Sequence, residues 1–175
     1  YEMVDEGTNA LIICFDVDEE SSMPFDDNEL IKRNYYEAKN PNEGIVEIDS
    51  GVTKGGAKYV YVILKHPMAR EDGVFMGTEY TMNVNIQVGN TIKFLNASFV
   101  EEGTTGIRDA VVLELLRSEN KVGENMEGWS VDPYEESYTE GFLMNMSEKV
   151  IYDEMFPLHP LSEERKLISY IVENN

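Results

Sequence analysis

The chain has 175 residues, enough for a single domain with a substantial hydrophobic core. Hydrophobic residues make up 42% and charged residues 27%, which is typical of a globular protein and excludes a disordered one. There are 34 acidic residues against 14 basic ones, and the net charge of −20 argues against binding to nucleic acid or anionic lipid. The charge favours a basic protein partner, although solubility explains it as well.

One domain is expected over residues 1–175, with its core in residues 8–118 and an acidic loop and helical segment in residues 119–175. The only cysteine is Cys14, so no internal disulfide can form, which favours a cytoplasmic location. An extracytoplasmic location stays open if a leader precedes Tyr1. No transmembrane segment is expected, because no apolar run approaches the ~20 residues that a spanning helix needs.

The first predicted element is an apolar run over residues 10–17, which is typical of a buried strand. Within this strand Cys14 is expected to be a small core residue. Acidic residues follow closely, and Asp26 or Asp27 can cap a helix that ends before Asn40.

A hairpin is predicted next, from residues 45–52 and 58–64. Its second strand is apolar on both sides: Tyr59, Tyr61 and Ile63 alternate with Val60, Val62 and Leu64. This pattern indicates a central strand that is covered on both faces of the sheet.

A second hairpin is predicted from residues 80–88 and 91–99, joined by Gly89 and Asn90. A glycine in the first turn position suits a type II′ turn. Closing the hairpin there puts mostly apolar side chains on one face of the sheet. The other face is polar but carries Phe94, so we expect it to be covered by a partner or by a helix such as the last one.

Helical elements dominate the rest of the chain. A helix from about Ile107 to Arg117 is expected to be capped by Thr104 or Thr105 and, because its apolar arc is wide, to pack on the sheet. Residues 118–141 are predicted to be irregular and acidic. A short helix after Ser147 and a last helix capped by Ser162 follow.

Together these elements predict an α+β fold: an antiparallel β-sheet built from two hairpins plus an N-terminal strand, with helices packed on its faces and a helical C-terminal extension. The order, and the run AKYVYVILK…GTEYTMNVNIQVGNTIKFLNASF followed by a helix, resembles the PsbP/Mog1-like group of small α+β domains over about residues 8–118. Members of that group are largely non-catalytic binding or assembly proteins, so the resemblance implies such a role. It identifies no functional residues.

The sequence Phe15-Asp16-Val17-Asp18 resembles the opening motif of haloacid-dehalogenase-type phosphatases, in which the first carboxylate is a nucleophile and both bind magnesium. Asp16 and Asp18 are therefore the metal-ligand candidates of an alternative function, a small enzyme or divalent-cation-binding protein. Solvated acids at a strand end explain the pair more simply, since the threonine or valine expected two places later is missing.

Two further sites are candidates for binding. Residues 101–106 bring glycines and hydroxyls to a helix N-terminus beside Arg108, an arrangement that can bind anions. A tight turn with capping threonines and a Glu–Arg pair explains the same residues. The polar hairpin face offers amide donors and acceptors from Asn83, Asn85 and Asn96.

Trp129 is the candidate hot spot for a protein interface, unless it packs on its own domain. Acids are concentrated in residues 1–31 and 118–160, and are expected to form one negative surface around Trp129; if the two segments lie apart, solubility explains the charge. The favoured function is a non-enzymatic binding or protein-interaction domain that needs no cofactor, with a basic protein as its partner.

Overall fold

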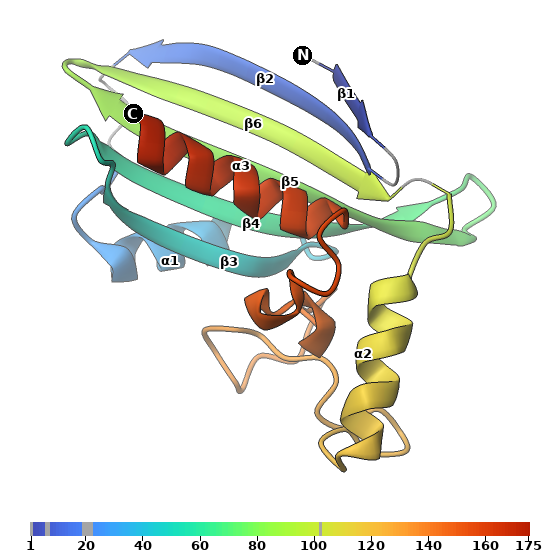
Figure 1. Cartoon of the computed structure of the whole chain (residues 1–175). Coiled ribbons are helices and arrows are strands. Elements are labelled where there is room, and N and C mark those ends of the chain that lie inside the picture. Colours follow the sequence, from blue (N-terminus) through green and yellow to red (C-terminus); the bar gives the residue numbers. More distant parts are fainter. Residues whose placement is uncertain (1, 6–7, 19–22, 102) are drawn as a thin grey trace.

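The fold is built on one antiparallel sheet (Figure 1). The computed structural model describes all residues except 1, 6–7, 19–22 and 102. Within the described residues the sheet has six strands in the order β1-β2-β6-β5-β4-β3. The strands are β1 (Glu2–Asp5), β2 (Thr8–Asp18), β3 (Gly44–Val52), β4 (Lys58–Ala69), β5 (Phe75–Val88) and β6 (Thr91–Glu101). The predicted α+β class with an antiparallel sheet is confirmed.

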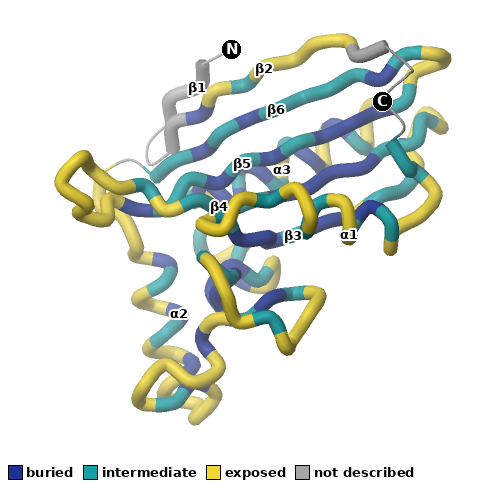
Figure 2. Tube along the Cα trace, turned by 180° about the vertical axis from the view of Figure 1, so that it is seen from behind, coloured by how far each residue is buried: buried dark blue, intermediate teal, exposed yellow. Residues whose placement is uncertain are grey.

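Three α-helices and two short 3₁₀ turns complete the described part of the chain: α1 (Asn28–Ala38), α2 (Ile107–Ser118), η1 (Met146–Glu148), η2 (Val150–Tyr152) and α3 (Pro160–Asn174). Helix α3 lies across one face of the sheet, and α1 lies on the opposite face near β3 (Figures 1 and 2). Helix α2 and the segment up to η2 lie below the sheet in Figure 1. Of the helices that the structure describes, none has both the length and the apolar character needed to cross a membrane.

The hairpin β5–β6 has the predicted register, with Val84 opposite Leu95. Its turn also agrees with the sequence. Gly89 has a φ of 60°, whereas Asn90 is not among the residues with positive φ. A positive φ at the first turn position alone is what a type II′ turn requires.

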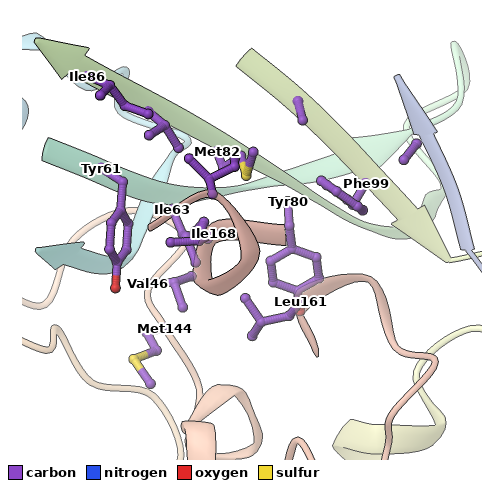
Figure 3. Close-up of a cluster of buried hydrophobic side chains, with 14 residues drawn as sticks. Val46, Tyr61, Ile63, Tyr80, Met82, Ile86, Phe99, Met144, Leu161 and Ile168 are labelled. Carbon is purple, nitrogen blue, oxygen red and sulfur yellow. The ribbon is translucent and has the colours of Figure 1, made fainter. Parts of the chain in front are cut away.

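The apolar face of this hairpin forms the main core with α3. Tyr80, Met82 and Val84 are buried, and they pack with Leu161 and Ile168 of the helix (Figure 3). The last helix therefore covers the apolar face, and the expectation that it covers the polar face is wrong. The apolar stripe of α3 decides this, because burying it against apolar strands gains the hydrophobic free energy that polar strands cannot supply.

Strand β4 is covered on both sides, as predicted. Tyr61 and Ile63 belong to the core under α3. Val60 and Val62 point the other way and pack with Ile31 of α1 in a second core.

Strand β2 exists as predicted but is not buried. Of its residues with described burial, Ala10 alone is fully enclosed, while Leu11, Ile13 and Phe15 are exposed on the face that carries α1. Helix α1 packs over β3 and β4, at the far end of the sheet, so it does not reach β2. Cys14 is exposed as well, and the prediction that it is a core residue is wrong.

Helix α2 does not pack on the sheet, contrary to the prediction. Its buried side chains Val112 and Leu116 contact Trp129 and Tyr152. The wide apolar arc correctly indicated a helix with buried positions, but the same arc is satisfied by any apolar neighbour, and here the neighbour is the irregular segment.

The N-cap residue predicted from the sequence is confirmed for one of the three α-helices. Asp27 caps α1 by accepting a hydrogen bond from the N–H of Leu30 at 3.0 Å, as predicted. Helix α2 is preceded by Gly106 in the left-handed conformation instead of a capping threonine. Helix α3 is capped by His159, whose Nδ1 accepts from the N–H of Leu161 at 3.2 Å, and not by Ser162.

Glu164 is a carboxylic acid inside the core. Its side chain is fully buried on α3, and neither carboxyl oxygen has a hydrogen-bond partner in the described part of the chain. Burial raises the pKa of Glu164 well above its ordinary value; Arg165 opposes this rise and Glu47 adds to it. The folded chain therefore favours the protonated acid.

We expect Glu164→Met to raise the free energy of unfolding at neutral pH by ~1–3 kcal/mol, because it replaces an unpaired buried polar group with an apolar one of similar size. The folded-state pKa lies above the unfolded-state value, so the wild type binds its proton more tightly when folded. Its stability should therefore fall as the pH rises from about 4 through the folded-state pKa.

Urea denaturation over the acid-to-neutral range measures both effects. Glu164→Gln serves as the control, since it keeps a buried polar group but cannot ionise, and the fall in stability with pH should be smaller in this variant than in the wild type. Equal pH dependence in the two proteins would contradict the assignment of a buried acid.

Candidate functional site

A network of buried charged side chains docks η1 against the sheet. Glu148 is fully buried, and its carboxylate accepts hydrogen bonds from Nζ of Lys65 at 2.9 Å and from the hydroxyl of Tyr80 at 2.8 Å. It also accepts from the N–H of Asn145 at 2.6 Å, which closes a capping box at the start of η1. Burial, and after it the negative charge of Glu148, raises the pKa of Tyr80, so its hydroxyl remains a donor.

Arg108 joins the start of α2 to the same segment. It is 1% exposed and donates to the carbonyl oxygens of Ser147 at 2.8 Å and Lys149 at 3.1 Å. It also donates to Ser162 Oγ at 2.9 Å and to Asp153 at 2.8 Å. These bonds are all to the protein itself, so Arg108 holds the helix in place.

In the described part of the loop before α2, Glu101 does not form the predicted pair with Arg108. Glu101 accepts instead from the N–H of Gly106 at 2.8 Å, so the chain's own carboxylate occupies a donor that an anion would need. The neighbouring Glu102 lies outside the described residues. Arg108 forms its ion pair with Asp153.

A cavity of about 370 Å³ lies beside this loop, with mainly apolar walls from Ile107 and residues 156–160. His159 Nε2 lies 3.6 Å from Glu101 in its wall. Burial, followed by the charges of Arg108 and Arg165, lowers the pKa of His159 to about 3, so the imidazole is neutral at physiological pH. Burial raises the pKa of Glu101, while the bond from Gly106 opposes the rise.

A pocket of about 440 Å³ lies between the sheet and the irregular segment; we call it the sheet–loop pocket. Three parts of the chain form its walls. The sheet contributes Lys65, Phe75 and Thr78, and α2 contributes Asp109. The irregular segment contributes Trp129, Ser130, Thr139, Gly141, Phe142, Leu143 and Asn145.

Trp129 packs against α2 on one side and lines the sheet–loop pocket on the other. It is 8% exposed and contacts Val112 and Leu116 of α2, so it does pack on its own domain. Its carbonyl accepts from the N–H of Met146, which fixes it beside η1. The indole N–H makes no hydrogen bond to any residue that the structure describes.

Asp109 gives the pocket its charge. It lies in the first turn of α2, where the helix dipole favours a carboxylate, and it accepts from Ser147 Oγ at 2.5 Å and Asn145 Nδ2 at 3.2 Å. No cationic side chain of the described residues pairs with it. Lys65, by contrast, is paired with Glu148, and the pocket is therefore anionic.

Hydroxyl groups supply further unused hydrogen-bonding capacity. Thr78, Ser130 and Thr139 line the pocket, and their hydroxyls bond to no other residue within the described ranges. Hydroxyls both donate and accept. The combination of a carboxylate, hydroxyls and aromatic walls suits a ligand that carries a positive charge and hydrogen-bond donors.

The predicted polar face lies elsewhere, on β5 and β6. Asn96 donates to Asn83 at 2.7 Å, so two of the amides use part of their capacity on each other, and Asn85 is buried. Phe94 packs against Phe15 of β2, with tilted rings whose centroids lie 4.8 Å apart. The structure thus separates this face from Trp129 and Arg108, and the predicted binding residues do not form one site.

Asp16 is the metal-ligand candidate whose side chain the structure describes, and it is not grouped with other acids of the described residues. Asp16 pairs with Lys93 at 2.5 Å, and the side chain of Asp18 lies outside the described part of the chain. Among the described residues no three His, Cys, Asp or Glu side chains are grouped as a metal site.

The acids of β2 lie apart from the acidic irregular segment. The irregular segment reaches α1 through a hydrogen bond from Tyr36 to Asp132, and β3 through Tyr134, whose hydroxyl accepts from the N–H of Ile48 at 2.6 Å. Strand β2 lies near the opposite edge of the sheet. The expectation of a single negative surface around Trp129 is therefore wrong for the acids of β2.

Sequence reasoning did not identify Lys65, Thr78, Asp109 or Asn145 as pocket residues. A lysine inside an otherwise apolar strand was the one local signal, because such a residue needs a buried counter-ion. Its partner, Glu148, is 83 residues away in the sequence, and no spacing rule identifies it.

We expect Arg108→Met to lower the free energy of unfolding by about 3–5 kcal/mol, because it leaves buried carbonyl groups and Asp153 with fewer partners. Arg117→Met is the matched control, an exposed arginine on the same helix, and should cost under ~1 kcal/mol. Chemical denaturation compares the two. Similar losses in both variants would contradict the structural role of Arg108.

No protein-family model matches the sequence, and no curated protein matches it. What the chain does must therefore be inferred from its own residues.

Proposed function

We propose that the chain is a non-enzymatic interaction domain. It uses its residues 118–145 and the sheet–loop pocket to bind a basic segment of a partner protein. The observation that carries the proposal is the pocket itself, where Trp129 and an unpaired carboxylate meet hydroxyls without partners among the described residues. Tryptophan beside polar groups is typical of interface hot spots. A binding or assembly role is also what the PsbP/Mog1-like resemblance implies.

The charge of the irregular segment supports a basic partner. Its exposed acidic residues are close in the sequence to residues that line the pocket: Glu124, Glu127, Glu135, Glu136 and Glu140. Lys121 is the only basic residue between positions 118 and 145. Such a segment attracts a cationic partner over a distance and repels nucleic acid.

We expect replacement of Glu124, Glu135, Glu136 and Glu140 by glutamine to slow association with a lysine-rich peptide several-fold at low salt. The effect should fade as salt is added, since the Debye length is about 8 Å at physiological ionic strength. Trp129 is the only tryptophan, so stopped-flow fluorescence reports binding at the pocket directly.

A control variant loses four acids elsewhere: Asp16, Asp26, Glu29 and Glu173 become their amides. It has the same change in net charge, and its exposed acids are on β2, before and within α1, and at the end of α3. It should slow association much less. Equal slowing in both variants would mean that net charge alone acts, and no slowing in either would refute an electrostatic role for the loop.

A further inference from the structure

We propose that the sheet–loop pocket seats a single cationic side chain, lysine or arginine, with Asp109 as its counter-ion. The inference rests on the proposed function and names the group that the pocket recognises. It concerns chemistry inside the pocket, whereas the proposed function concerns the acids around it.

Asp109 is held ready for such a ligand. Asn145 and Ser147 bond to its carboxylate, so the side chain is oriented before any ligand arrives. Two carboxylate oxygens offer about four acceptor positions, and the described contacts leave capacity for another donor. An ammonium or guanidinium group placed there gains a charge-assisted hydrogen bond, which is stronger than a neutral one.

Lys65 does not take this role. Its Nζ lies 2.7 Å from Glu148, donates to the carbonyl of Leu143 at 3.1 Å, and covers the ring of Phe142 at 4.3 Å. Lys65 is 2% exposed, so the ion pair is buried in the pocket wall. Because its two charges are opposite, the pair carries no net charge. The charge that faces a ligand is therefore that of Asp109.

The other walls suit the rest of the side chain. Ring carbons of Trp129 and Phe75 can pack on the aliphatic part of a lysine or arginine side chain. Such side chains readily bury their methylene groups while the charged end stays solvated or paired. Hydroxyls of Thr78 and Ser130 can accept from the remaining N–H groups. At about 440 Å³ the pocket has room for one such side chain, and a free amine shares the same chemistry.

The test titrates Trp129 fluorescence with three probes: a lysine-containing peptide, the same peptide acetylated at Nε, and butylamine as the free amine. Acetylation removes the charge but keeps the stem. We expect the acetylated peptide to bind about tenfold more weakly, as the loss of one charge-assisted hydrogen bond predicts.

Asp109→Asn should weaken binding of the lysine peptide by a similar factor. The lysine peptide and the acetylated peptide should then bind this variant equally well. Glu114→Gln is the matched control, since it removes an exposed charge from the same helix outside this pocket, and it should bind as the wild type does. If Asp109→Asn fails to fold by circular dichroism, Thr139→Arg replaces it. This exposed position on the rim brings in a competing guanidinium, with Thr139→Gln as its neutral control.

Each outcome decides a different claim. A lysine peptide that binds equally well after acetylation, or equally well to Asp109→Asn, overturns the cation pocket and leaves the proposed function standing. Butylamine binding that depends on Asp109, without binding of either peptide, supports the cation pocket and overturns the protein partner. No binding of any probe overturns both.

Discussion

The ion pair between Lys65 and Glu148 is the contact on which the arrangement of the irregular segment depends. Both side chains are removed from water, at a cost that their mutual attraction offsets only when their remaining hydrogen bonds are made. Tyr80 and the N–H of Asn145 make those bonds. Strand β4, its neighbour β5 and the turn η1 are therefore held together, because removing Lys65 or Glu148 leaves a buried charge uncompensated and removing Tyr80 takes away one of its hydrogen bonds.

A second set of charges extends this network to the helices. Asp153 accepts from Arg108 of α2 and from Arg165 of α3, and Arg165 also donates to Glu47 of β3 at 2.8 Å. The basic side chains that the fold does bury are each matched by a carboxylate. Most of the other acids that the structure describes lie at the surface, where they set the electrostatic field that a partner meets, whereas Glu164 is buried without a basic partner.

The same network forms a hydrogen-bonded wall beside a polar pocket. Ser147 and Asn145, which flank the buried pair, are the residues that orient Asp109. Binding to a pre-oriented group costs less conformational entropy than binding to a mobile one. The structural role of η1 and the proposed recognition role of Asp109 are thus two consequences of one docking interaction.

Sequence alone predicted strands β2 to β6, the register of the second hairpin and the type of its turn, since alternation of side chains and a glycine at position 89 are local properties, but it did not predict β1. It did not determine what α2 packs on, because an apolar arc is satisfied by any apolar neighbour. Nor did it identify the pocket. Glu148 pairs with a lysine 83 residues away, and such pairings leave no periodic trace. Only the folded chain brings Asp109, Trp129 and Thr78 to one cavity, since they come from three elements that meet through tertiary packing.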